Sequence, residues 1–384
     1  MELSAEDALR LNVLLANRLE AVRIDESQMV VHALSPEGEA SVRLNPQGRD
    51  DQYLKKVREL LSSQVLGSPG GYPVFLRRWT RMGQARDDSL EQLLLLGEPE
   101  AVVAVVHASG LTDEIARRAW WAMPVADNAR RMLEHACVVN GNLGRELAEF
   151  LVDYLPFETE HKAMIETIRL VLQPGLISDE LREKLWRAAK RRNAYYIGFM
   201  DACPDNLPEQ VAARADWQQV SEILAPLVEK DNEVARQLCR CLSASGQGFL
   251  KTAEAAMAKP TNQDVVVEFL KSIQGYFSSV CPHTDSAADM ETIVSDAEAL
   301  LDVPPVCPTT TAVHEVLQKL PDHGADVRAM MALGWVGEPL VNPIFSHTDS
   351  IGSVMRKKIV PVTGPIQQQF SQLRGKVKTK GITA

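Results

Sequence analysis

Hydrophobic and polar positions follow two different periods along the chain, and the first 85 residues combine both. Apolar residues at helical spacing over about 5–18 and 50–64 predict two helices. Between these helices lie three segments with strand-like patterns, at 21–24, 29–34 and 40–44. The turn signal Ser35-Pro36-Glu37-Gly38 separates the last two segments. The pattern predicts a small α+β unit with a three-stranded antiparallel meander, and residues 72–76 fit a further strand.

From about residue 87 onward the period becomes helical. Short amphipathic segments follow one another, and the breaks between them carry Gly, Pro, Asn or Asp, as in Asn140-Gly141-Asn142 and Gln173-Pro174-Gly175. Consecutive short helices with brief breaks favour an irregular helical-repeat, α-solenoid-like stack. No fixed period runs along the chain, so an irregular helical bundle is the alternative. The predicted fold class is therefore mostly α, with strands confined largely to 20–80.

Composition suggests three parts. Residues 1–86 form the predicted α+β unit, 87–302 the helical repeat-like region, and 303–384 a C-terminal helical segment. Two prolines at Pro304-Pro305 and a third at Pro308 indicate a stiff connector at the start of the last part. The tail from Arg374 is basic and polar, and few of its groups can be buried, so we expect it to be mobile.

The net charge and the lack of long apolar runs exclude some classes of protein. The 384 residues include 41 Lys and Arg against 51 Asp and Glu, a net charge of −10, which argues against a general nucleic-acid binder. The start of the chain is acidic and polar, and no apolar run approaches the roughly 20 residues that cross a bilayer. We therefore expect a soluble cytoplasmic protein that does not bind membranes.

The sequence gives only weak signals for catalytic, cofactor-binding or metal-binding motifs. The loop 67–71 is rich in glycine but lacks the spacing of a phosphate-binding loop, and no nucleophile or kinase motif occurs. Cys239 and Cys241 would point in nearly opposite directions on a helix, so no metal site is predicted from them and Cys281-Pro282-His283. No catalytic, cofactor-binding or metal-binding residue is assigned, and no cofactor is expected. Cys281, in a predicted loop, is the candidate reactive thiol.

Two basic clusters stand out on this acidic chain. Arg77, Arg78 and Arg81 surround Trp79 and form the candidate partner surface. The second cluster lies at 187–192, just before Tyr195-Tyr196. Basic groups beside aromatic rings can hold phosphates and stack bases, but a solvated helix face above core aromatics gives the same pattern. We therefore expect a protein partner, with nucleic acid as the less favoured possibility through these local clusters.

A resemblance to a known family suggests a biological role, which these patterns do not. The run Val65–Leu90, with Arg77-Arg78-Trp79-Thr80-Arg81 inside it, and the run Arg117-Arg118-Ala119-Trp120-Trp121-Ala122-Met123-Pro124 resemble the DsrS family. Proteins of this family are encoded beside the reverse-acting dissimilatory sulfite reductase system of sulfur-oxidising bacteria. The resemblance implies a cytoplasmic accessory role in the oxidation of stored sulfur. It implies no reaction and supplies no catalytic residue. From the residues alone, Trp120-Trp121 predicts packing between helices.

Three hypotheses about function follow. The leading one is a non-enzymatic accessory or scaffold protein that presents helical surfaces to partners during sulfur oxidation. The second is a thiol-based sulfur-handling protein that uses a reactive cysteine, either Cys281 or one in the Cys239/Cys241 region. The third is a regulatory nucleic-acid-binding protein that uses the two basic clusters.

Overall fold

The computed structural model describes residues 3–67, 90–281, 289–347 and 350–376. Backbone contacts divide the chain into two compact units. Unit 1 comprises Met1–Pro156 and Gln173–Ile177, and unit 2 comprises Phe157–Leu172 and Ser178–Ala384. The boundary between the units differs from the boundaries predicted after residues 86 and 302, because segments that are far apart in the sequence contact one another.

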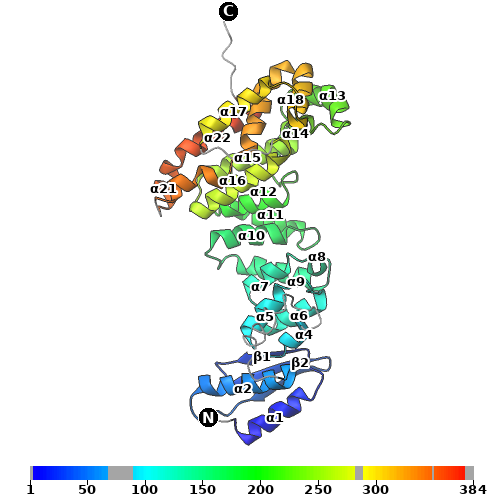
Figure 1. Ribbon diagram of the computed structural model, residues 1–384, viewed down its shortest axis with the longest axis vertical. Helices are drawn as coiled ribbons and strands as arrows, with labels where there is room; N and C mark the ends of the chain where they lie inside the picture. The colour runs from blue at the N-terminus through cyan, green and yellow to red at the C-terminus, as the bar shows by residue number, and fades with distance from the viewer. Residues whose placement is uncertain (1–2, 68–89, 282–288, 348–349, 377–384) are drawn as a thin grey trace, which may run out of the picture. The chain divides into compact units, whose positions relative to one another are not determined.

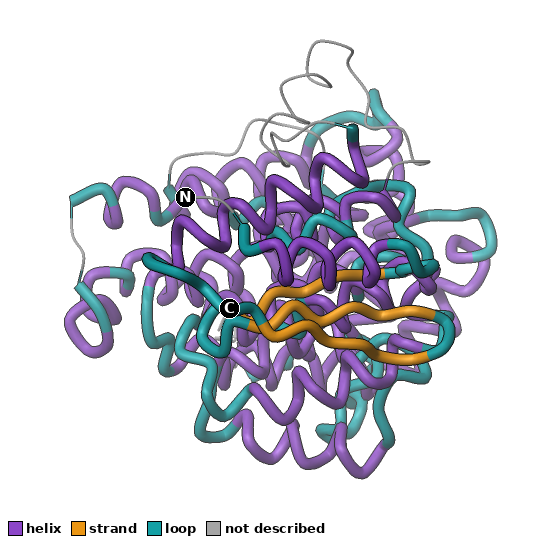
Figure 2. The backbone as a smooth tube through the Cα atoms, turned by 90° about the horizontal axis from the view of Figure 1, so that it is seen from below, coloured by secondary structure: helices purple, strands orange, loops and turns teal. Residues whose placement is uncertain are grey.

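Unit 1 begins with the predicted meander. Its strands are β1 (Ala21–Asp25), β2 (Val30–Ser35) and β3 (Gly38–Arg43), and they lie side by side in that order (Figure 2). Both pairings are antiparallel, with Val22 opposite Ala33 and Val31 opposite Val42. The sequence prediction of a three-stranded antiparallel sheet is therefore confirmed. The further strand predicted at 72–76 lies outside the described residues.

Two helices share a hydrophobic core with this sheet. They are α1 (Ala5–Leu15) and α2 (Asp50–Leu66), and their buried side chains include Leu11, Val57 and Leu61. The fully buried carboxylate of Asp7 belongs to the same region. Its Oδ2 accepts hydrogen bonds from the hydroxyl of Tyr53 at 2.5 Å and from the backbone N–H of Asn45 at 2.9 Å. Two donors thus satisfy Oδ2 of this buried carboxylate, whose polar atoms would otherwise be costly to bury.

The rest of unit 1 is helical. Its elements are α4 (Leu90–Leu93), α5 (Pro99–Val106), α6 (Asp113–Ala122), α7 (Ala126–Met132), α8 (Ala136–Val139) and α9 (Leu143–Tyr154). These helices are tied to the sheet, because the N–H of Val22 in β1 donates to the carbonyl of Leu94 at 2.8 Å. The contact explains why the α+β segment does not end as a separate unit near residue 86.

Unit 2 consists of short helices joined by brief turns (Figure 1). Its elements are α10 (His161–Val171), α11 (Asp179–Ala189), α12 (Ala194–Ala202), α13 (Trp217–Val228), α14 (Glu233–Leu242), α15 (Ala244–Ala258), α16 (Gln263–Phe277), η2 (Ser278–Val280), α17 (Met290–Asp302), α18 (Pro308–Lys319), η3 (Pro321–His323), α19 (Gly324–Gly334), η4 (Glu338–Leu340), α20 (Asn342–Phe345), α21 (Gly352–Lys358) and α22 (Val360–Leu373). Strands in the described part of the chain occur only within 21–43, so the predicted change to a helical chain beyond residue 87 is confirmed.

Helices α10 and α12 approach each other closely at Gly198. A Cβ atom placed on this residue would lie 2.6 Å from the Cβ of Ile168 and 2.7 Å from the carbonyl oxygen of Ile165. Real Cβ atoms do not come this near to other atoms. The absence of a side chain at Gly198 is therefore what lets the two helices pack at this distance.

A partly buried arginine connects three distant segments of unit 2. Arg214, which precedes α13, bonds through Nη2 to Asp326 Oδ2 at 2.7 Å and through Nε to Asp216 Oδ1 at 2.7 Å. Its Nη1 also donates to the carbonyl of Leu373 at the end of α22, at 3.4 Å. We call this the Arg214 clasp. Because it joins α13, α19 and α22, the segment from residue 303 onward belongs to unit 2 and is not a separate part.

The first residues of the predicted mobile tail contact α15. Arg374 forms an ion pair with Glu254 on α15, and Lys376 Nζ lies 3.0 Å from Glu254 Oε2. Both cations thus share one carboxylate, and the mobility of the tail from Arg374 onward stays a prediction.

Candidate functional site

Helix α6 carries the second run of the resemblance and presents two different faces. It begins after Thr112, whose Oγ1 accepts a hydrogen bond from the N–H of Ile115 at 3.2 Å and so caps the helix. The inner face buries Ile115, Ala119 and Trp120. The indole of Trp120 packs edge-on against Phe150 at 4.8 Å. The prediction of inter-helix packing is therefore confirmed for Trp120.

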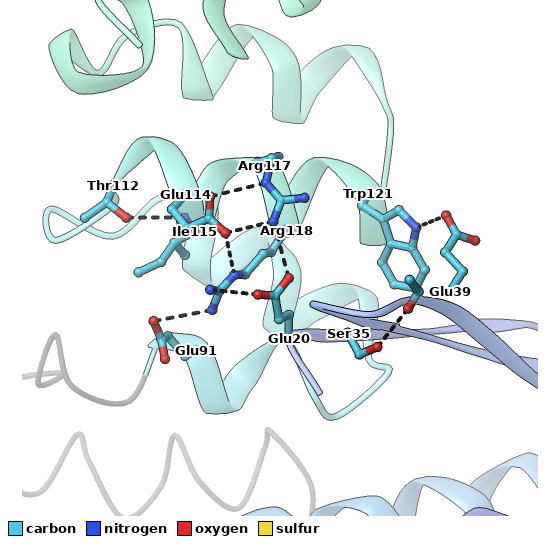
Figure 3. A network of polar contacts seen from close by, with 11 residues as sticks. Glu20, Ser35, Glu39, Glu91, Thr112, Glu114, Ile115, Arg117, Arg118 and Trp121 are labelled. Atoms are coloured by element: carbon cyan, nitrogen blue, oxygen red, sulfur yellow. Dashed lines mark hydrogen bonds and ion pairs between the residues drawn. The ribbon is translucent and has the colours of Figure 1, made fainter. Parts of the chain in front are cut away.

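The outer face of α6 forms a network of charged and aromatic side chains, drawn in part in Figure 3. We call it the α6 network, and its members are Glu20, Arg23, Glu39, Glu91, Glu114, Arg117, Arg118 and Trp121. They come from β1, β3, α4 and α6 and from the residue before β1. The chain thus gathers on one surface of unit 1 residues that are far apart in the sequence.

Arg118 is the centre of the charged part of this network. Its guanidinium lies 3.2 Å from Glu20 Oε1, 3.4 Å from Glu91 Oε1 and 3.2 Å from Glu114 Oε1. Arg117 binds the other oxygen of Glu20 at 3.3 Å and also Glu114 at 2.8 Å. Glu20 therefore bridges the two arginines, which fixes the direction in which both guanidinium groups point (Figure 3).

Trp121 forms the aromatic part of the network. Its indole N–H donates to Glu39 Oε1 at 2.6 Å, and the guanidinium of Arg23 lies 4.6 Å from the ring centre. Arg23 also donates to the carbonyl of Trp121 at 3.3 Å. A half-buried indole is thus held between a strand cation and a strand carboxylate. For Trp121, the contact partners are charged groups rather than the helix packing that the sequence predicted.

The electrostatics of the network favour recognition over proton transfer. Hydrogen bonds from Arg117 lower the pKa of the Glu114 carboxyl, and those bonds to Glu114 raise the pKa of the Arg117 guanidinium. Each partner thus keeps the other charged at neutral pH. A general acid or base works best with a pKa near the working pH, which these two groups move away from. Ordered charges beside a flat indole are suited to binding a polar partner surface.

The predicted partner surface at Arg77, Arg78, Trp79 and Arg81 lies outside the described residues. The described chain resumes at Leu90, and the next residue, Glu91, is a member of the α6 network. Glu91 directly follows the first run of the resemblance, which ends at Leu90. The second run supplies Arg117, Arg118 and Trp121.

The second basic cluster is built as an ordinary helix end. Residues 187–192 finish α11 and begin the turn to α12. Tyr195 is buried, and the guanidinium of Arg192 lies 6.0 Å from its ring. Tyr196 contacts Trp186 edge-on at 5.1 Å. Because Tyr195 is buried, its ring offers no open face on which a base could stack, and Tyr196 is half-buried.

Cys281, the predicted reactive thiol, lies directly after η2 and packs against α19. A Cβ atom on Gly334 would be 3.2 Å from the Cβ of Cys281. Burial raises the pKa of this thiol to about 11, so little thiolate forms near neutral pH. Burial also raises the pKa of Cys241 to about 12. The structure therefore does not favour Cys281 as a nucleophile.

A different cysteine has the environment of a reactive thiol, and sequence reasoning missed it. Cys307 caps the N-terminus of α18, where its sulfur accepts a hydrogen bond from the N–H of Thr310 at 3.5 Å. Bonds from the side chain and then the backbone of Thr310 lower the pKa of the Cys307 thiol. The signal was present in Cys307-Pro308-Thr309-Thr310, because proline favours the first position of a helix and the preceding residue is then the cap.

Neither a metal site nor a membrane span is found in the described part of the chain. No group of three His, Cys, Asp or Glu side chains within these residues could hold a metal ion. Within the same residues, no helix is long and apolar enough to cross a membrane.

Comparisons with known proteins do not extend this description. No family model, curated protein or solved structure matches the chain.

Proposed function

We propose that this protein is a cytoplasmic accessory or scaffold protein without catalytic activity of its own, and that it acts in the dissimilatory oxidation of stored sulfur. The DsrS resemblance supports the pathway. The observation that carries the accessory role is the α6 network, in which the exposed Arg117, the half-buried Trp121 and the mostly buried Arg118 of the resembling run are held by carboxylates. In this proposal the network binds a protein partner of the sulfur-oxidising system.

The test compares variants in a sulfur-oxidising bacterium that carries this gene. Deletion should slow the consumption of stored sulfur, and the wild-type gene should restore it. Trp121→Ala should fail to restore it, and Trp121→Phe, which keeps a flat ring but loses the N–H bond to Glu39, should restore it in part. Arg10→Ala on α1 is the matched control, because Arg10 pairs only with the neighbouring Glu6 in the described residues.

Two measurements make the result decisive. Each variant protein should keep the melting temperature of the wild type, so that a defect reports binding and not folding. The tagged wild type should co-purify with a component of the sulfite reductase system, and Trp121→Ala should lose it. Normal sulfur consumption in the deletion strain would refute the proposed function.

The structure changes which residues could support the two alternative functions, the thiol-based one and the nucleic-acid-binding one. A thiol-based function could no longer rest on Cys281, whose pKa is raised by burial, and Cys307 becomes the thiol to examine. A nucleic-acid function loses the stacking rings of the second basic cluster, because Tyr195 is buried. These observations leave the accessory role as the proposal that the described residues support best.

A further inference from the structure

The C-terminal part of this acidic chain has the opposite charge. Residues 350–384 contain no Asp or Glu, whereas the whole chain has a net charge of −10. The cations in this stretch are Arg356, Lys357, Lys358, Arg374, Lys376, Lys378 and Lys380. Arg374 and Lys376 both pair with the single carboxylate of Glu254. The cations of α21 are therefore the group to examine for an external partner.

Helix α21 is fixed to the body of unit 2. The N–H of Gly352 donates to the carbonyl of Thr261 at 3.0 Å, and Arg356 Nη1 donates to the carbonyl of Pro260 at 3.2 Å. The side chains of Met355 and Ile359 are buried beneath it. Because both bonds reach the loop after α15, the outer face of α21 has a defined position relative to α15.

A groove of about 560 Å³ lies between the end of α15, α21 and the start of α22. Met257, Ile359 and Val360 give it an apolar lining, and Arg356 and Lys357 add positive charge. Of these three side chains, Val360 is 56% exposed, whereas Met257 and Ile359 are only 9% and 1% exposed. Val354 on α21, which does not line the groove, is 54% exposed. The groove therefore combines one exposed apolar side chain, above buried ones, with basic side chains.

The charge of the groove is not balanced from within the described chain. No carboxylate is among its lining residues in the part that the structure describes. In that part, Arg356 bonds only to a backbone carbonyl, and Lys357 makes no hydrogen bond or ion pair. The carboxylates of a partner could thus pair with these two cations without displacing an existing ion pair.

We propose that this groove binds an acidic amphipathic segment of a protein partner. Its carboxylates pair with Arg356 and Lys357, while its apolar side chains cover Val360. Helices of this kind dock by one apolar face into a groove. No aromatic side chain lines the groove in the described residues, which disfavours RNA, and the floor of a concave groove is out of reach of a flat bilayer surface. The inference rests on the proposed accessory role only in that a protein partner exists.

The test uses the full chain and a fluorescein-labelled synthetic peptide of about fifteen residues. The peptide has leucines at i, i+3, i+4 and i+7 and glutamates on the opposite face. Fluorescence anisotropy should show saturable binding that weakens as salt is raised. A scrambled peptide of the same composition and a peptide with lysines in place of the glutamates should bind at least about tenfold more weakly, a difference of about 1.4 kcal/mol.

Variants of the protein locate the binding site. Lys357→Glu and Val360→Asp should each weaken the peptide by about tenfold or more, and both positions are exposed, so the melting temperature should not change. Lys184→Glu on α11 changes the net charge equally at another exposed position of unit 2 and should bind like the wild type. Equal binding of the scrambled peptide, or unchanged binding by both groove variants, would overturn the inference.

Other outcomes identify other partners. Sedimentation of the protein with phosphatidylglycerol vesicles, together with no peptide binding, would overturn the inference in favour of a membrane surface. The proposed function fails separately: it is refuted if the deletion strain consumes stored sulfur normally, whatever the peptide does. Conversely, a clear sulfur defect with no peptide binding refutes only the groove.

Discussion

Replacing Gly198 by alanine sets two effects on the stability of unit 2 against each other. In the interior of a helix, alanine is favoured over glycine by about 0.5–1 kcal/mol. At Gly198, however, the new methyl group would lie 2.6 Å from Ile168 Cβ and 2.7 Å from the carbonyl of Ile165. The backbone carbonyl cannot rotate away, so α10 and α12 would have to separate.

The magnitude follows from the difference between these effects. Overpacking of a well-packed core costs about 1–3 kcal/mol, and contacts this short place Gly198→Ala in the upper part, about 2–3 kcal/mol. Subtracting the helix preference of about 0.5–1 kcal/mol leaves a net loss of about 1–2.5 kcal/mol. For a domain of about 150–250 residues this lowers the melting temperature by about 2–10 °C.

Gly275 supplies the matched control. It also lies in a helix of unit 2, α16, but a Cβ atom there would meet nothing within 4 Å. Gly275→Ala should therefore stabilise unit 2 by about 0.5–1 kcal/mol and raise its melting temperature. Differential scanning calorimetry of the full chain measures both variants. If Gly198→Ala stabilises the protein as much as Gly275→Ala does, the close approach of α10 and α12 is refuted.

Three further predictions concern other residues. Tyr53→Phe removes a donor from the buried carboxylate of Asp7 and should destabilise unit 1 by about 1–3 kcal/mol in urea denaturation. Burial, and then Asp7, raise the pKa of Tyr53 above its usual 10.0, so the wild type should lose stability as the pH rises beyond that value, and Tyr53→Phe should lack this loss. Cys307 should react with iodoacetamide before Cys281 near neutral pH, as followed by mass spectrometry of timed samples, and faster labelling of Cys281 would contradict the geometry. Glu20→Gln should cost unit 1 about 1 kcal/mol and speed amide hydrogen exchange in α6, whereas unchanged exchange would mean that the α6 network does not order the helix.

Local patterns were sufficient to predict the elements. The turn Ser35-Pro36-Glu37-Gly38 between two strand-like segments predicted the hairpin of β2 and β3, and the helical period after residue 87 predicted a helical chain. Each of these signals depends on residues that are close together in the sequence, so the sequence alone is enough to detect it.

Contacts between distant segments could not be predicted in this way. The unit boundary depends on the bond from Val22 to Leu94, and the α6 network depends on Glu20 meeting Arg118, 98 residues later. Cys281 illustrates the same limit. Its neighbours in sequence suggested an accessible loop, but α19 packs against it and burial raises its pKa. The sequence around Cys307 contained a usable signal, because a helix cap is a local structure.

The Arg214 clasp has a consequence for the order in which unit 2 can assemble during synthesis. Asp326 follows Arg214 by 112 residues and Leu373 follows it by 159. At about 5–20 residues per second, the ribosome adds Asp326 roughly 6–22 s after Arg214. During that interval Asp216, two residues away, is the partner of the clasp already present in the nascent chain. The Arg214 clasp is therefore complete only after α22 has been synthesised. Until then, the helices made earlier expose apolar surface that α22 later covers. We expect this unit to be the part of the nascent chain that chaperones bind.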